Sequence, residues 1–345
     1  TDQIFATYIG GSGEDLPRSA MTNLFGQCFV FGSTGSTDFP TTPGAIQTEH
    51  AGEIDIFISR ISEDGTEMIG STLIGGSGTD GRNLVSFGYD AFRGELSLDQ
   101  EGNVYVASAT GSDDFPATPG TYSTELDGNS DGVVAKVAPS LSAAYWITTI
   151  GGAEDDVAYG VRVKDNGDVV VAGSTVGDSF ETTPGVYQEV AEAGGGFQNG
   201  FVAILNNSGS SLVASTFAST SAEDQAYFVD LDNDENIWIY GRSTGPEEWP
   251  ITDGVFTTET KSLFITQFNP SLTEVIASTM IGPDTPNGFA SPAPVAFLVD
   301  RCDRVYMSCY SAPNDMPVTD DALFNTGGFY LAAFEESLTL LSFAT

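Results

Sequence analysis

Apolar and polar residues alternate along most of the chain, in short runs that are separated by turns. The clearest examples are paired runs joined by Asp, Asn and Gly, as in "GELSLDQEGNVYVASAT" from Gly94 and "GVRVKDNGDVVVAGST" from Gly160. A period of two is typical of half-buried strands, and such a turn between two of them favours a β-hairpin. Helical periodicity longer than a turn or two is absent from the sequence. The pattern therefore predicts an all-β chain.

The pattern returns five times. Six Thr-rich runs, "FATYIGG", "GSTLIGG", "WITTIGG", "ASTFAST", "ASTMIGP" and "LSFAT", align on threonines at positions 7, 72, 148, 216, 279 and 345, at intervals of 65, 76, 68, 63 and 66 residues. Each interval holds one Thr-rich run, one hairpin and a fourth apolar run such as "DIFISRISEDG". We expect repeats at 3–66, 67–142, 143–210, 211–273 and 274–337, with 338–345 as the first strand of a further repeat.

Four antiparallel strands in each repeat, iterated five times, predict a single β-propeller domain of four-stranded antiparallel blades over residues 1–345. A β-helix or a sandwich is the alternative, although the coils of a β-helix are shorter than these repeats. The chain begins and ends with the same Thr-rich strand of the repeat, so six such strands are present for five blades. We expect "SFAT" or "IFAT" to pair with a flanking blade or a neighbouring molecule outside the five repeats. A piece of a longer, seven-bladed propeller and a self-sufficient five-bladed ring are the two models that remain open.

A proline-rich decamer, first written "DFPTTPGAIQ" at 38–47, recurs in each repeat between the third and fourth runs. Its Thr-Pro step favours one helical turn. Large apolar residues occupy two fixed places in it, the first being Phe39, Phe115, Phe180, Trp249 and Met316, and the second Ile46, Tyr122, Tyr187, Phe256 and Leu323. A unique active site would occur once. We therefore interpret the decamer as scaffold that packs over the blade edge or against the neighbouring blade.

Charge narrows the classes of function. Asp and Glu total 48 against 11 Lys and Arg, a formal net charge of −37. Such a surface repels phosphate backbones and anionic lipid heads, which disfavours nucleic-acid and direct membrane binding. No apolar run approaches the ~20 residues of a membrane helix. An acidic coat suited to salty surroundings is one interpretation, and divalent-cation binding is the other. The chain opens without Met, as expected of a mature form or an excised piece.

The segments "YIGGSGED", "STGSTDFPTTPGAIQ" and "DIFISRISEDG" resemble the SBBP-type β-propeller repeat of bacterial surface proteins. Further along, "FRGELSLDQEGNVYVAS", "EDQAYFVDLD" and "PVAFLVDRCDRVYMS" resemble, in that order, segments of large Bacteroidota exoproteins with gliding-motility-associated C-terminal sorting domains. The resemblance covers essentially the whole chain. It implies export by type IX secretion and a non-enzymatic, adhesin-like surface protein. "ASTSAED", "IGPDTPN" and the missing proline after Phe180 depart from the repeat.

Two sets of acids are candidates for binding cations. One set closes the glycine-rich loops and consists of Asp15, Asp80, Asp156 and Asp224, with Asn287 in the fifth repeat. An Asx side chain that accepts backbone N–H groups would hold such a loop, and a ring of cation sites is the alternative. The other set is Asp230, Asp232 and Asp234 in "DLDNDENIW", which resembles the start of a calcium loop without its closing Glu. Ca²⁺ is the one cofactor considered, against a solvated acidic hairpin.

One insertion breaks the repetition, "NLVSFGYDAF" at 83–92. It should share a face with the decamer loops, so Tyr89, Phe92 and Arg93 are candidate ligand contacts, and a plug or a blade-packing loop is the alternative. Catalysis finds little support, because His50 is the single histidine and no GxSxG occurs. Cys28, Cys302 and Cys309 have no metal-binding spacing and are expected to be unpaired thiols.

These features predict a non-enzymatic, extracellular propeller module that acts as a scaffold for protein or surface interaction. Its expected partners are other domains of the same exoprotein, neighbouring copies, or surface glycans. A calcium-dependent, lectin-like propeller is the alternative, and a glycoside-processing enzyme is a third hypothesis, which would need a deep funnel lined by carboxylates.

Overall fold

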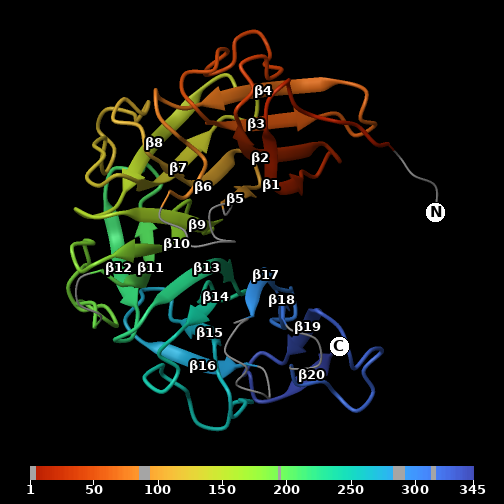
Figure 1. Cartoon of the computed structure of the whole chain (residues 1–345), viewed down its shortest axis with the longest axis vertical. Coiled ribbons are helices and arrows are strands. Elements are labelled where there is room, and N and C mark those ends of the chain that lie inside the picture. Colours follow the sequence, from red (N-terminus) through yellow and green to blue (C-terminus); the bar gives the residue numbers. More distant parts are fainter. Residues whose placement is uncertain (1–4, 85–93, 193–195, 283–291, 312–315) are drawn as a thin grey trace. The chain divides into compact units, whose positions relative to one another are not determined.

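The computed structural model describes residues 5–84, 94–192, 196–282, 292–311 and 316–345. In this part of the chain the regular structure consists of strands joined by turns (Figure 1). No helix found there has the length and apolar character needed to cross a membrane. The chain divides into two compact units, Thr1–Val171 with Leu205–Leu212 and Ala172–Ile204 with Val213–Thr345.

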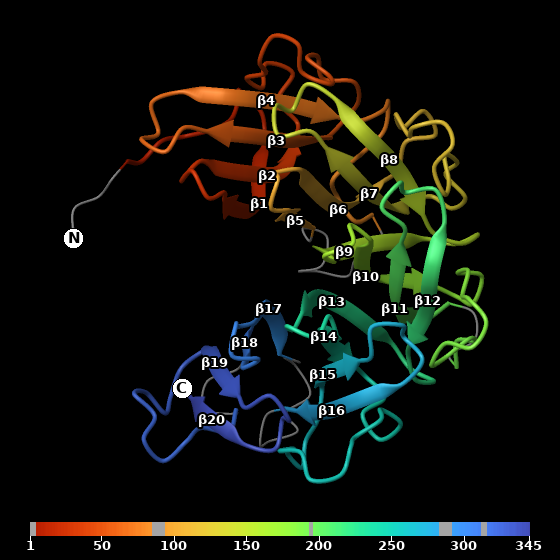
Figure 2. The same cartoon turned by 180° about the vertical axis from the view of Figure 1, so that it is seen from behind.

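The described strands form five antiparallel sheets of four strands each, and within every sheet the strands follow chain order (Figure 2). The first two sheets contain β1 (Asp15–Thr22), β2 (Cys28–Thr34), β3 (Asp55–Ile61), β4 (Met68–Ile74), β5 (Glu95–Leu98), β6 (Val104–Thr110), β7 (Asp131–Val137) and β8 (Ala144–Ile150). The third contains β9 (Asp156–Val163), β10 (Val169–Val176), β11 (Gln198–Leu205) and β12 (Leu212–Ala218).

The last two sheets contain β13 (Asp224–Leu231), β14 (Ile237–Ser243), β15 (Leu263–Phe268), β16 (Val275–Ile281), β17 (Ala293–Val299), β18 (Val305–Tyr310), β19 (Phe329–Phe334) and β20 (Leu341–Ala344). These sheets are the five blades of a β-propeller, so the predicted fold class is confirmed. Each predicted hairpin supplies the first two strands of a blade.

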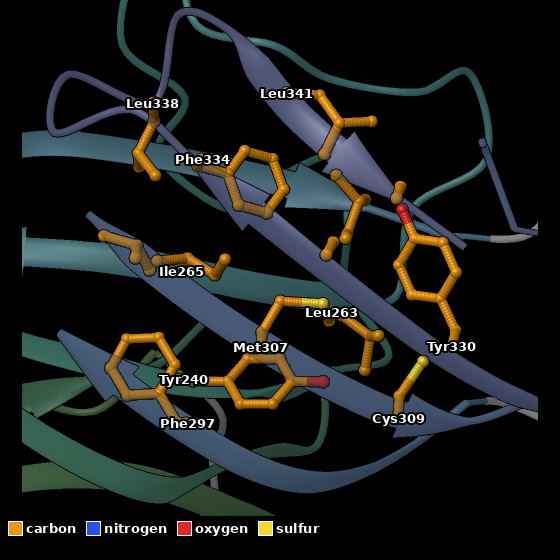
Figure 3. Packing of buried hydrophobic residues seen from close by; sticks show 14 of the residues in the cluster. Tyr240, Leu263, Ile265, Phe297, Met307, Cys309, Tyr330, Phe334, Leu338 and Leu341 are labelled. Carbon is orange, nitrogen blue, oxygen red and sulfur yellow. The ribbon is translucent and has the colours of Figure 1, made fainter. Parts of the chain in front are cut away.

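The core lies between neighbouring sheets, where middle strands are buried on both faces. In the fourth and fifth sheets, Tyr240 of β14 packs on Phe297 of β17 with ring centroids 5.5 Å apart (Figure 3). Met307, Phe334 and Leu338 belong to the same buried cluster. Burying a side chain of this size stabilises the fold by about 1.5–3 kcal/mol. Inter-sheet packing is therefore the main stabilising contact of this cluster.

The sheets are offset by one strand from the sequence repeats. The five Thr-rich runs after "FATYIGG", each expected to open a repeat, are instead the fourth strands β4, β8, β12, β16 and β20. The segment 338–345 was expected to start a further repeat, but its β20 pairs with β19 inside the fifth sheet. "SFAT" therefore pairs within the fifth sheet. At the other end, Phe5, Ala6 and Thr7 lie in no strand.

Hydrogen bonds between the decamer and the fourth strand explain this grouping. The Thr-rich strand receives the decamer of its own sheet, because the threonine hydroxyl accepts a backbone N–H of that decamer. Examples are Gln47 N–H to Thr72 Oγ1 at 3.1 Å and Gln188 N–H to Thr216 Oγ1 at 2.9 Å. The aligned threonines therefore report decamer docking within one sheet.

Candidate functional sites

The first apolar position of the decamer is buried in all five sheets. Its residues are 4 to 8% exposed, namely Phe39, Phe115, Phe180, Trp249 and Met316. Three of them pack on an aromatic ring of the third strand of their own sheet, with centroid distances of 4.6 Å for the tilted pair Phe39–Phe57 and of 4.1 Å and 3.8 Å for the stacked pairs Phe180–Phe201 and Trp249–Phe264. The interpretation of this position as scaffold is confirmed.

The second apolar position joins one sheet to the next. In four sheets its backbone N–H donates to a carbonyl in the turn between the third and fourth strands of the following sheet: Ile46 to Leu141 at 3.2 Å, Tyr122 to Gly209 at 2.8 Å, Tyr187 to Leu272 at 2.7 Å and Phe256 to Leu338 at 2.8 Å. Every acceptor residue has a φ between 58° and 65°. We call this arrangement the sheet junction. It confirms that the decamer packs against the neighbouring blade.

The acids that close the glycine-rich loops hold those loops by hydrogen bonds. In each described case a carboxylate Oδ2 accepts the backbone N–H four residues earlier: Gly11 to Asp15 at 2.8 Å, Gly76 to Asp80 at 2.7 Å, Gly152 to Asp156 at 2.6 Å and Thr220 to Asp224 at 2.6 Å. The loop-holding role is therefore confirmed for these four residues. Asn287 lies outside the described residues.

The three candidate calcium ligands around β13 have different surroundings. Asp230 is 8% exposed, and its Oδ2 accepts the N–H of Val299 in the next sheet at 2.8 Å. Asp234 is exposed in the turn. Within the described ranges, no three His, Cys, Asp or Glu side chains are grouped so that they could hold a metal ion. Calcium binding here stays a prediction, and it would require these side chains to rearrange.

Asp232 has a full set of protein partners. Its Oδ2 accepts the Trp238 indole N–H at 2.9 Å and the Gln267 amide at 2.8 Å. The same turn acid recurs in two other sheets, where a tyrosine hydroxyl six residues on is the donor: Tyr105 to Asp99 at 3.0 Å and Tyr306 to Asp300 at 3.2 Å. Because the same acid has equivalent partners in three sheets, its role is best explained as holding the hairpin turn.

The candidate ligand contacts Tyr89, Phe92 and Arg93 lie outside the described residues. His50, which a Ser-His-Asp or Cys-His arrangement would have to use, has its Nε2 3.1 Å from the Thr34 carbonyl oxygen. The three cysteines are free, as predicted, and burial raises the pKa of the Cys309 thiol to about 12.

A polar groove that the sequence did not predict is lined by residues of the second and third sheets. It has a volume of about 670 Å³ and is lined by Asn103, Lys136, Tyr145, Trp146, Asp168, Asn206, Asn207 and Ser208. We call it the amide groove. Lys136 comes from β7 and Tyr145 from β8, whereas Asn207 comes from the turn before β12. The one sequence signal was the Asn pair in "FVAILNNSGS", which is not matched in the other turns of this kind.

The groove is held by its own hydrogen bonds. Lys136 Nζ donates to Asn207 Oδ1 at 2.7 Å and lies 5.2 Å from the Tyr105 ring centroid and 5.8 Å from that of Tyr145. The Asn207 N–H donates to Asp168 Oδ1 at 3.0 Å, and the Trp146 indole donates to the Asn207 carbonyl at 2.9 Å. Tyr145 itself is 55% exposed. The groove thus presents one aromatic face, one ammonium group and several amides in fixed positions.

Comparison with known proteins supports the fold but assigns the chain to no family. No family model matches the sequence, and no curated protein matches it. Among solved structures, the NanB sialidase from Streptococcus pneumoniae is similar over 99% of this chain and 62% of its own, with a TM-score of 0.51 and 10% identity. A protein of unknown function from Dyadobacter fermentans is similar over 96% of this chain and 83% of its own, with a TM-score of 0.48 and 12% identity. At this identity the likeness shows a shared propeller architecture alone.

Proposed function

We propose that the chain is a non-enzymatic interaction module of a secreted surface protein, and that it binds a further blade of its own repeat type. The resemblance to SBBP repeats of Bacteroidota exoproteins supports the location, and the acidic surface fits an extracellular setting. The sheet junction supports the interaction. Four junctions are made within the chain, and the fifth sheet carries the donor half of another.

That donor half is exposed. Leu323 occupies the second apolar position of the fifth decamer and is 80% exposed, and within the described chain its N–H makes no junction bond. The neighbouring Phe324 is 67% exposed and Phe329 57% exposed. Both line an apolar cavity of about 370 Å³ in the fifth sheet. Exposed apolar surface of this kind marks interaction sites in soluble proteins. This half-junction is the observation that carries the proposal.

A contact of Phe5 in the first sheet supports the proposal. Trp146, on the fourth strand of the second sheet, lies against Gly209 so closely that an added Cβ would be 2.5 Å from its ring. Phe5 lies against Gly65 in the same way, at 2.3 Å, and both glycines have positive φ. Phe5 thus takes the place of a residue from the last strand of a preceding blade. The occupant we propose for the fifth sheet is the matching turn of a following blade, carried by another segment of the larger protein.

The direct test extends the chain after Thr345 with a copy of its residues 217–282, which continue in phase because Thr216 and Thr345 align. We expect the Leu323 amide to become protected from hydrogen exchange and the melting temperature to rise by at least about 2 °C. A Leu323→Pro change in the extended chain removes the donor and should abolish the rise in melting temperature, whereas Leu323→Ala should retain the protection of the amide at position 323. Unchanged exchange and melting in the extended chain would contradict the proposal.

The amide groove favours carbohydrate as a second ligand of the module. Exposed aromatic faces and fixed amide groups are the elements that orient a sugar ring without chemistry. The groove is lined by the acid Asp168, and a neighbouring cavity that shares Asn103, Lys136 and Asn207 is lined by Asp99, Glu101 and Asp165, so an uncharged oligosaccharide is the better match.

A glycan array with and without calcium tests this second function, followed by titration of any retained oligosaccharide. We expect Tyr145→Ala to weaken binding at least about tenfold, because truncating a central aromatic contact costs more than 1 kcal/mol. Tyr310→Ala, which removes a similarly exposed tyrosine from the fifth sheet, should leave binding unchanged. Binding that survives Tyr145→Ala, or no retained oligosaccharide at all, would remove the groove as a sugar site.

A further inference from the structure

Two buried carboxyl pairs occupy equivalent places in the first two sheets. In the first pair, Asp55 begins β3 and Asp80 closes the loop after β4, and both are 0% exposed. A Cβ added to Gly75 would lie 2.4 Å from Asp55 Oδ1 and 3.0 Å from Asp80 Oδ2. Both oxygens therefore approach a single point on the glycine that separates them, and the two carboxyl groups share one buried site.

The second pair repeats this geometry. Asp131 begins β7 and Asp156 closes the loop after β8, with exposures of 2% and 1%. A Cβ added to Gly151 would lie 2.5 Å from Asp156 Oδ2 and 3.0 Å from Asp131 Oδ1. A larger residue than glycine would fill the space that the two carboxyl groups face.

Donors are distributed unevenly within the first pair. Asp80 accepts three hydrogen bonds, from Thr110 Oγ1 at 2.5 Å, Gly76 N–H at 2.7 Å and Ser112 Oγ at 2.9 Å. On Asp55, Oδ2 accepts from Gln47 Nε2 and Ala51 N–H, both at 2.9 Å. Its Oδ1 is buried and has no hydrogen-bond partner.

The two oxygens of Asp131 differ in the same way, because Oδ2 accepts the Asp127 N–H at 3.0 Å while Oδ1 is buried without a hydrogen-bond partner. In each pair, the unpartnered oxygen lies beside the glycine, Gly75 or Gly151, against which the second carboxyl group also lies. An ionised oxygen in that position would be strongly unfavourable, because it would be desolvated, unpaired and close to a second negative charge.

The third sheet carries a natural variant of the pair. Asn199, the second residue of β11, stands at the position where the first two sheets have Asp, and the loop acid of the same repeat phase is Asp224. Its amide Nδ2 donates to the Gly177 carbonyl at 2.7 Å. An amide is neutral and has the shape of a protonated carboxyl group. The third repeat thus fills this position with a side chain that carries one negative charge fewer.

We propose that each of the two pairs holds one proton between its carboxyl groups, with Oδ1 of Asp55 and Oδ1 of Asp131 as the protonated atoms, and that these protons couple the stability of the first two sheets to pH. Asp80 and Asp156 remain the ionised acceptors that hold their loops. The proton donated across each pair satisfies the orphaned oxygen and removes one of the two buried charges.

The electrostatic surroundings agree with this assignment. Burial raises the pKa of Asp55, burial and the neighbouring Asp55 charge raise that of Asp80, and burial raises that of Asp131 to about 6. Near the first pair along the chain are Glu49, His50, Glu53, Arg82, Asp113 and Asp114, and near the second are Glu125, Asp127, Glu154 and Asp155. The His50 charge acts against protonation of Asp55, Arg82 is a second cation two residues after Asp80, and the charges of Asp127 and Asp155 favour protonation of Asp131.

The sign of the pH effect follows from linkage. A carboxyl group whose pKa is higher in the folded chain than in the unfolded chain contributes stability that is fully present below the unfolded value, near 4, and is lost as the pH rises through the folded value. For Asp131 that loss is centred near pH 6. The first two sheets should therefore be more stable at about pH 5 than at about pH 8.

The experiment measures melting temperature from about pH 5 to about pH 8, together with ¹³C carboxyl shifts of the aspartates. We expect Asp55→Asn with Asp131→Asn to reduce the fall in melting temperature by at least about half and to remove two carboxyl signals that titrate above the ordinary aspartate range. Asn199→Asp should steepen the fall, because it creates a third pair. Glu336→Gln, which removes one negative charge from an exposed position as each Asp→Asn change does from a buried one, should leave the pH dependence of the melting temperature unchanged.

The contradicting results are equally specific. A double Asn variant with the same pH dependence as the parent, or with no missing high-pH carboxyl signals, would overturn the proposal. So would a calcium-dependent rise in melting temperature at about pH 8 that the double variant loses, since a cation rather than a proton would then occupy the pairs.

Discussion

Replacing Trp249 with alanine should lower the free energy of unfolding by about 3–5 kcal/mol. The indole is 5% exposed, stacks on Phe264 at 3.8 Å, and donates from Nε1 to Thr266 Oγ1 at 3.2 Å. Alanine would leave a cavity over β15 and would remove the indole N–H that donates to Thr266 Oγ1. Chemical denaturation followed by tryptophan fluorescence and circular dichroism gives the change in unfolding free energy.

Phe197→Ala provides the control, because this ring is 47% exposed just before β11 and belongs to no decamer. Its truncation should cost less than about 1 kcal/mol, in line with surface substitutions. Equal losses for the two variants would mean that the decamer contributes no more to stability than an ordinary surface loop.

Asp232→Ala should cost about 3 kcal/mol. The change leaves the buried Trp238 indole N–H and the 5% exposed Gln267 amide without their acceptor. It also removes the acceptor of the Asn236 N–H, bonded at 2.9 Å, and so loosens the turn. Thermal and urea unfolding of the variant measure the loss.

Asp234→Ala separates the two explanations of this turn. Asp234 is exposed, so its replacement should change the unfolding free energy by less than about 0.5 kcal/mol. If Asp232 acts only through its protein partners, both results should be the same in calcium and in chelator. A calcium-dependent stabilisation that Asp230, Asp232 and Asp234 lose together when changed to Asn would instead establish the cation site.

Features that depend only on residues close together in the sequence were predictable. The hairpins follow from local alternation, and the decamer could be assigned to scaffold because its two apolar positions recur at fixed spacing. The loop acids, such as Asp80 and its Gly76 partner, are four residues apart, so a local rule was sufficient to predict their bond.

Features that depend on which segments meet were not predictable. The phase of the sheets is set by hydrogen bonds between the decamer and the fourth strand, as between Gln47 and Thr72, which lie 25 residues apart. The amide groove joins Lys136 to Asn207 across 71 residues. The carboxyl pair of Asp55 and Asp80 was not predictable for the same reason, because each acid taken alone has an ordinary loop-holding partner.

The central claim is that equivalent sheet junctions join the blades and that the fifth sheet offers one more. Hydrogen exchange at the amides of Ile46, Tyr122, Tyr187, Phe256 and Leu323 in the dilute chain tests it most directly. We expect the first four to be protected, because each N–H is bonded to the next sheet, and Leu323 to exchange as fast as an exposed loop amide. Protection of Leu323 equal to that of the other four, in the chain on its own, would contradict the claim.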